Sequence, residues 1–127
     1  MKFTIPLIPV SKKNSQRIVN NGGKYILLPS KQYVDYEEKA GWFIPKLPKP
    51  ISEPLNIKCL FYMPTKRRCD LTNMLEAIDD VMVKYRLIED DNYTIIVSHD
   101  GSRVLYDKNN PRTEVEIMTI QNINRRA

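Results

Sequence analysis

Residues 66–91 read KRRCDLTNMLEAIDDVMVKYRLIEDD, and they carry the clearest helix signal of the chain. A basic triplet opens the segment, and an acidic cluster, Glu89-Asp90-Asp91, closes it. Between them apolar residues recur every three or four positions, which is the spacing of a helix with one buried face. These residues are Leu71, Met74, Leu75, Ile78, Val81, Met82 and Tyr85. The pattern predicts a helix with Asp70 or Thr72 as its N-cap and with Asp91 in a turn beyond its other end.

The polar side of this helix has two interpretations. It is predicted to carry Asn73, Glu76, Asp79, Asp80 and Lys84. In the first interpretation these side chains and the acidic turn are only solvated. In the second, neighbouring carboxylates repel one another and a divalent cation relieves that repulsion. Mg²⁺ takes one or two carboxylates and completes its shell with water and substrate phosphate, so the basic triplet next to Asp70 favours the second interpretation.

The composition is that of one globular domain. The chain has 127 residues, of which 42% are hydrophobic and 28% charged, enough for one core and not for two. A net charge of +5 favours polyanionic partners. No apolar run approaches the ~20 residues that span a bilayer and no signal peptide is apparent, so we expect a cytoplasmic protein with no membrane role. Cys59 and Cys69 are predicted to be reduced thiols without zinc, and His99 a polar residue at a strand end.

The remaining patterns predict an α+β fold, a small mixed β-sheet with two main helices packed on it, in a single domain over residues 1–127. Ser30 is the predicted N-cap of a helix through about Phe43. Pro6 and Pro9 confine the first strand to an edge or cut it short. Strands are predicted over residues 2–10, 55–63, 93–97, 102–106 and 113–120, with a hairpin over 17–29 that turns at Asn20-Asn21-Gly22-Gly23. Residues 121–127 are expected to form a mobile tail.

Two segments carry a resemblance to a known family. Residues 68–73 (RCDLTN), the helix after them and the closing Asp90-Asp91 pair resemble the core motif of RusA-type Holliday junction resolvases, the crossover junction endodeoxyribonucleases. That family has an Asp-Leu-Asp-Asn box, a Lys one turn into the helix and a closing Asp-Asp pair. Residues 9–17 (PVSKKNSQR) resemble its opening strand and loop, so the likeness spans about residues 3 to 120. The spacing from the box to the Asp pair is its specific part.

The resemblance implies that Asp70 and Asp91 are metal ligands and that Asn73 is the box asparagine. The chain departs from the family pattern at two positions. Thr72 stands where the family has the second box aspartate, and Glu76 stands where it has the helix lysine. Because a threonine hydroxyl is a poor Mg²⁺ ligand compared with a carboxylate, one ligand is missing.

Glu76 is a candidate replacement for that ligand. Residues 72 and 76 are only ~40° apart around a helix, and helical side chains lean toward the N-terminus. A glutamate at 76 can therefore bring its carboxylate near the place that an aspartate at 72 would occupy. The alternative is that Glu76 is an ordinary exposed residue and the enzyme is damaged. We predict metal and catalytic roles for Asp70, Glu76 and Asp91, and supporting roles for Thr72, Asn73 and Asp90.

The activity that the resemblance implies is Mg²⁺-dependent hydrolysis, with Mn²⁺ as the other candidate, of phosphodiesters in branched DNA. A homodimer would cut both strands of a four-way junction during recombination and repair, in a bacterial cell and encoded by host, phage or prophage. Predicted contacts to backbone phosphates are Lys12, Lys13, Lys66, Arg67 and Arg68. The alternative is a junction- or DNA-binding protein of the same fold that has lost its metal site, supported by Thr72. A basic interaction module with no DNA role is a third option, which the box-to-pair spacing disfavours.

Overall fold

The computed structural model describes residues 1–12 and 17–120, and its sheet is built on the strand β4 (Leu55–Met63). Alternate residues of β4, Ile57, Cys59 and Phe61, are fully buried, as expected for a strand with one face on a core. β7 (Arg112–Thr119) runs antiparallel along one edge of β4. β1 (Lys2–Ile5) pairs antiparallel with the far edge of β7. The last strand of the chain thus lies inside the sheet.

Two short strands share the other edge of β4. β5 (Ile96–Ser98) pairs with its beginning and β6 (Arg103–Tyr106) with its end, both in parallel. The sheet is therefore mixed, with five strands. Together with the helices below, this confirms the predicted α+β class.

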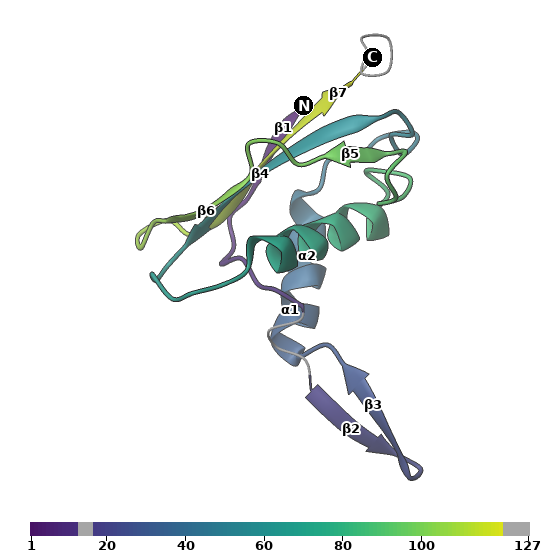
Figure 1. Cartoon of the computed structure of the whole chain (residues 1–127), viewed down its shortest axis with the longest axis vertical. Coiled ribbons are helices and arrows are strands. Elements are labelled where there is room, and N and C mark those ends of the chain that lie inside the picture. The colour runs from purple at the N-terminus through teal and green to yellow at the C-terminus, as the bar shows by residue number, and fades with distance from the viewer. Residues whose placement is uncertain (13–16, 121–127) are drawn as a thin grey trace.

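Both helices lie against the same side of the sheet (Figure 1). α1 (Lys31–Ala40) begins at Ser30, whose Oγ accepts a hydrogen bond from the Tyr33 amide at 3.1 Å, and a 3₁₀ turn, η2 (Gly41–Phe43), follows it. α2 (Leu71–Lys84) buries the apolar face that its sequence predicts. Within the described residues, no helix is long and apolar enough to span a membrane.

The hairpin of β2 (Arg17–Asn21) and β3 (Lys24–Leu28) projects away from this body (Figure 1). Gly22 and Gly23 form its two-residue turn, and both have positive φ, 62° and 86°. Positive φ at both positions is what a type I′ turn requires. Every residue of β3 is exposed.

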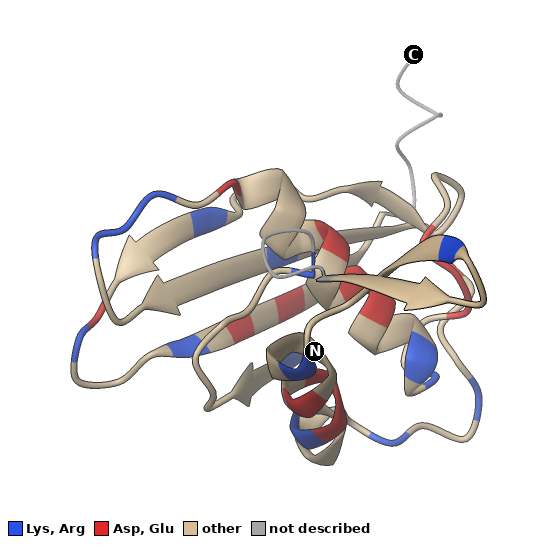
Figure 2. Ribbon diagram, turned by 90° about the horizontal axis from the view of Figure 1, so that it is seen from below, with Lys and Arg blue, Asp and Glu red and all other residues tan. Residues whose placement is uncertain are grey.

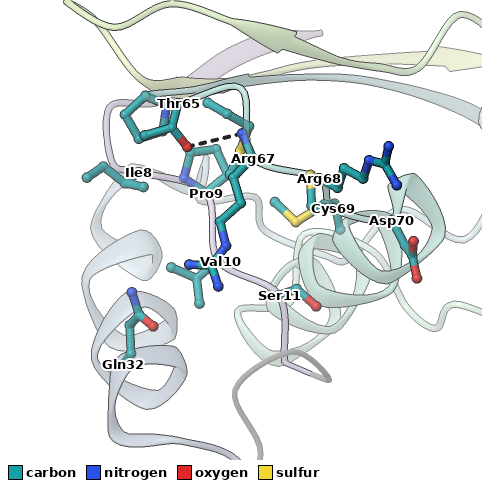
Figure 3. Close-up of a pocket in the computed structure, with 13 residues that line it drawn as sticks. Ile8, Pro9, Val10, Ser11, Gln32, Thr65, Arg67, Arg68, Cys69 and Asp70 are labelled. Atoms are coloured by element: carbon teal, nitrogen blue, oxygen red, sulfur yellow. Dashed lines mark hydrogen bonds between the residues drawn. The ribbon is translucent and has the colours of Figure 1, made fainter.

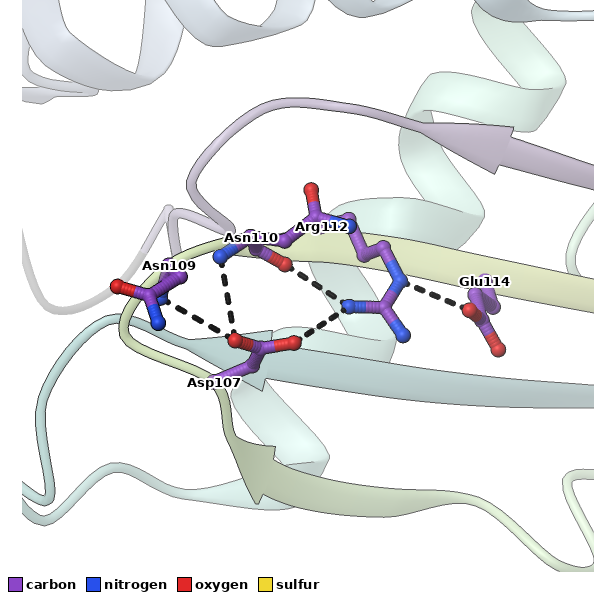
Figure 4. Close-up of polar contacts among 5 residues, drawn as sticks. All are labelled: Asp107, Asn109, Asn110, Arg112 and Glu114. Carbon is purple, nitrogen blue, oxygen red and sulfur yellow. Dashed lines mark hydrogen bonds and ion pairs between the residues drawn. The ribbon is translucent and has the colours of Figure 1, made fainter.

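The chain crosses from β6 to β7 over the end of β4, and Arg112 fixes this crossing (Figure 4). Its Nη1 donates to Asp107 Oδ2 at 3.0 Å and to the Asn110 carbonyl at 2.9 Å, and its Nε donates to Glu114 at 2.8 Å. The guanidinium also lies 3.7 Å from the centre of the Tyr62 ring on β4. The loop is therefore tied to both β4 and β7.

Four predictions need correction or limits. The first strand ends at Ile5, before Pro6 removes a backbone donor, and does not continue to Val10. Asp79, predicted on the solvated side of α2, is buried with an exposed fraction of only 9%. The predictions for Lys13 and for the tail 121–127 lie outside the described residues.

Candidate functional site

The N-terminal end of α2 presents the first predicted ligand. Asp70 occupies the N-cap position, but its side chain makes no capping hydrogen bond. Instead its Oδ2 accepts a hydrogen bond from Asn73 Nδ2 at 3.2 Å, and the residue is exposed. The first helical turn thus holds the Asp70 carboxylate open to solvent, in a position that a cation or a water-bridged phosphate can reach. Thr72 is exposed and Glu76 is exposed farther along the helix.

Asp91 lies in the loop that follows α2. Asp90 shapes this loop, because its carboxylate accepts hydrogen bonds from the Asp91 amide at 2.8 Å and from Asn92 Nδ2 at 2.9 Å. Partial burial, a hydrogen bond with Asp90 and the charge of Asp80 raise the pKa of Asp91. Asp91 is thus electrostatically coupled to the third turn of α2.

A partly buried Asp–His pair lies near these carboxylates. His99 Nε2 lies 2.9 Å from Asp79 Oδ2, and His99 Nδ1 lies 2.7 Å from the Ile57 carbonyl. Both partners are acceptors, so both ring nitrogens donate when Asp79 is ionised, which requires an imidazolium. Asp79 raises the pKa of His99 despite the opposing effect of burial. Burial raises the pKa of Asp79 itself, and the charge of Asp91 adds to that rise.

Asp80, one residue later, is paired with the amino-terminal segment. Lys12 Nζ lies 3.0 Å from Asp80 Oδ2 and 6.0 Å from the centre of the Tyr33 ring on α1. Lys12, predicted as a phosphate contact, therefore already has a carboxylate partner. This pair joins the segment after β1 to both helices.

The single chain does not assemble the predicted ligands into one site. Asp91 is coupled to Asp79 and Asp80, and the ten helical residues from Asp70 to Asp80 span about 15 Å. In the described part of the chain, no group of three His, Cys, Asp or Glu side chains could hold a metal ion. Carboxylates are the donors that Mg²⁺ prefers, so the chemistry of the predicted ligands fits such an ion, although the described residues of one chain do not group three of these side chains in advance.

The basic triplet forms the loop that leads into α2. Figure 2 shows basic residues on this loop and acidic residues along the helix that it enters. Lys66 Nζ lies 5.2 Å from the centre of the Tyr106 ring, which holds it at the β6 side. Arg67 and Arg68 are exposed, and neither guanidinium has an ion-pair partner among residues 1–12 and 17–120.

A cleft of about 530 Å³ separates this loop from the segment after β1 (Figure 3). The end of β4 supplies Met63, the loop supplies Thr65, Arg67 and Asp70, and α2 supplies Met74. The opposite wall consists of residues 8–11 and of Gln32 on α1. The cleft thus opens beside the first predicted ligand.

Sequence reasoning missed the Asp79–His99 pair, the Lys12–Asp80 pair and the position of Gln32 in the wall of the cleft. The adjacent aspartates Asp79 and Asp80 were a signal for the Asp79–His99 pair. Because they are next to each other beside the apolar stripe of the helix, one of the two had to point toward the core. No comparable signal marked Gln32, because its position depends on how α1 packs beside residues 8–11.

A comparison with protein families identifies a match that covers most of the chain. The family model for the endodeoxyribonuclease RusA matches residues 6–118, which include the box at residues 70–73 and the closing Asp90-Asp91 pair. No curated protein matches the chain.

Proposed function

The chain belongs to the RusA endodeoxyribonuclease family, and from this premise we propose that it resolves Holliday junctions by Mg²⁺-dependent, paired hydrolysis of DNA phosphodiesters in recombination and repair. The observation that carries the proposal is the family match over residues 6–118. The exposed arginines beside the open Asp70 carboxylate support it, because a cation-rich loop next to a carboxylate suits a phosphodiester. We propose that the protein acts in the cytoplasm of a bacterial cell and is encoded by the host, a phage or a prophage.

In this proposal Asp70, Glu76 and Asp91 hold the metal, with Thr72, Asn73 and Asp90 in supporting positions. A divalent ion, when bound, supplies an activated water and neutralises charge that develops on the phosphate. One or two carboxylates are enough to hold Mg²⁺ when water and substrate phosphate supply its other ligands. The described residues contain no preformed group of three carboxylates, so in this proposal the DNA phosphate completes the coordination of the metal. Asn73 orients Asp70 through the hydrogen bond described above. Lys66, Arg67 and Arg68 bind the backbone beside it, as we also propose for Lys12 and for Lys13, which lies outside the described residues.

We further propose a homodimer, since two strands of a four-way junction must be cut together. The β2–β3 hairpin is the surface that we assign to it. An isolated two-stranded hairpin is marginal in water, and this one exposes Ile18, Tyr25 and Leu27 by 72%, 77% and 58%. Contact with a second copy would cover these side chains.

The test is cleavage of a synthetic four-way junction by the wild-type chain, Asp70→Asn and Thr72→Asp, with and without Mg²⁺. The proposal expects paired nicks from the wild type that require the metal, and none from Asp70→Asn at unchanged junction binding. Thr72→Asp should cut at least as fast as the wild type, because it restores a carboxylate of the family box.

The second candidate is a protein that binds junctions without cutting them, and Thr72 is the observation that favours it. It predicts a mobility shift with the junction but no cleavage by the wild type. Gain of cleavage only in Thr72→Asp would establish this candidate and would show that the remaining site is intact.

A further inference from the structure

We propose that the cleft beside Asp70 takes one unstacked nucleotide of the DNA strand next to the phosphate that is cut, with its base against the Arg67 guanidinium. The inference rests on the proposed function, because it needs DNA as the substrate. It adds a site that selects the base at the point of cleavage.

The size and lining of the cleft fit a single nucleotide. Its volume of about 530 Å³ lies within the roughly 300–1,000 Å³ of small-ligand sites, which excludes a duplex. Its apolar lining residues include Ile8, Pro9, Val10, Met63 and Met74. An apolar lining suits the faces of a base, which are the least polar part of a nucleotide.

Arg67 supplies a planar cation inside the cleft. Figure 3 shows its side chain running from the loop toward Val10 and Gln32, whereas Arg68 points to the other side, above the start of α2. The Arg67 amide donates to Thr65 Oγ1 at 3.4 Å, which anchors the base of the side chain. Unstacked bases pack on guanidinium planes as they do on aromatic rings. Since Arg67 has no acidic partner in the described residues, its charge is available to the strand.

Gln32 can read the edge of that base. It reaches the cleft from the exposed start of α1 (Figure 3). A glutamine amide offers both donors and an acceptor, so it can distinguish bases by their hydrogen-bonding edges. Asp70 and Arg68 line the far side of the cleft, where the phosphate of a nucleotide bound in this way would lie.

The experiment uses four-way junctions that carry the fluorescent base 2-aminopurine beside the mapped cleavage position. Fluorescence and the mobility shift of the junction are both measured. No metal is added, so that no strand is cut. The fluorescence of this base rises when it leaves the stack. We expect a several-fold rise on binding the wild-type chain. Arg67→Lys keeps the charge but removes the plane, so it should lose the rise and weaken binding by about tenfold, the size of one stacking contact. Arg103→Lys, at an exposed position on β6 and not among the residues that line the cleft, is the matched control and should keep the rise.

A second variant tests the reading of the base. Gln32→Leu keeps the volume and lies on an exposed helix face, so it should fold and cut. We expect its cleavage positions on a junction with a mobile branch point to spread over more sequences than those of the wild type. An unchanged distribution would overturn the role of Gln32.

The outcomes separate this inference from the proposed function. Junction binding with no fluorescence rise, or with an equal rise for Arg67→Lys, would overturn the nucleotide site and leave the resolvase proposal standing. No junction binding at all would overturn both.

Discussion

Position 76 is where this chain adds a carboxylate that its family pattern lacks, one helical turn after Thr72. If Glu76 is the third ligand, Glu76→Gln should lower the junction cleavage rate at least about 100-fold, the upper end of what outer-shell changes around metals cost, while binding stays unchanged. The measurement is single-turnover cleavage with Mg²⁺ in excess. Glu38→Gln, at an exposed position on α1, is the matched control. Undiminished cleavage by Glu76→Gln would remove the residue from the ligand set.

The Asp79–His99 pair gives stability a pH dependence with a defined sign. The pKa of His99 is raised in the folded state from about 6.5 in the unfolded chain, so its stabilising effect is complete below about pH 6.5 and is lost as pH rises through the folded pKa. The pKa of Asp79 is also raised in the folded state, so its ionisation likewise lowers the free energy of unfolding as pH rises above about 3.9. The free energy of unfolding should therefore fall between about pH 6.5 and the higher pKa of the folded His99.

Urea unfolding of the wild type and of His99→Gln across that range checks this prediction. His99→Gln should flatten the profile above about pH 6.5 and cost about 1–3 kcal/mol near pH 6, since it leaves a buried carboxylate without its charged partner. Asp79→Asn is the control, because it removes the buried carboxylate charge itself. It should lower the free energy of unfolding by less than His99→Gln does. A profile that keeps its slope in His99→Gln would assign the pH dependence to another group.

At the scale of elements, the β2–β3 hairpin tests the assembly. Ile18 and Leu27 are directly opposite each other in the antiparallel register, so they form one apolar patch. The double variant Ile18→Ser/Leu27→Ser should shift the protein from dimer to monomer in sedimentation velocity. Its thermal unfolding as a monomer should still be cooperative, because neither residue belongs to the core cluster.

Tyr93→Ser is the control for the hairpin, since Tyr93 is 84% exposed in another loop. It should leave the oligomeric state unchanged. A double variant that remains dimeric would move the interface to a different surface.

The junction of α1 and η2 depends on a glycine. A Cβ at Gly41 would lie 2.3 Å from Cζ of the Tyr85 ring, closer than atoms can approach. Gly41→Ala should therefore displace Tyr85, which also lies under Lys46, and lower the free energy of unfolding by about 1–3 kcal/mol.

Denaturant unfolding measures this loss, and Tyr85→Ala provides its control. In the Tyr85→Ala background the same glycine replacement should be nearly neutral, because the ring it meets is gone. An equal loss in both backgrounds would show that backbone effects, not the ring, limit position 41.

The elements differ in how far their sequence predicts them. The apolar stripe of α2, the Ser30 cap and the Gly22-Gly23 turn are local signals, and the structure confirms all three. The parallel pairing of β5 and β6 with β4 joins residues about forty apart, and no local pattern encodes such a pairing. The surroundings of Asp91 were unpredictable for the same reason, because they depend on the path of the loop after α2. The ligand roles of Asp70, Glu76 and Asp91 remain predictions.

At the scale of the molecule, the proposed binding of DNA should depend on net charge. With a net charge of +5, binding should weaken linearly in a plot of log affinity against log salt. Replacing Arg67 and Arg68 by Gln should reduce the slope by about 0.9 for each phosphate that is no longer neutralised. Fluorescence anisotropy with a labelled junction at several salt concentrations measures this slope.

Lys2→Gln is the control for charge alone. Lys2 is paired with Glu116 on the sheet, away from the loop into α2, and its replacement should leave the slope within error. Equal slopes for the arginine variant and the wild type would place the DNA on another face.

The position of β7 has a consequence for synthesis of the protein. This strand leaves the ribosome after every other described element, yet it fills the place between β1 and β4. Until it emerges, β1 has no partner in the sheet and β4 keeps an open edge that invites pairing with other nascent chains. Productive folding therefore has to wait for translation of residues 112–119, and truncated products should be cleared or precipitate rather than persist as a smaller folded domain.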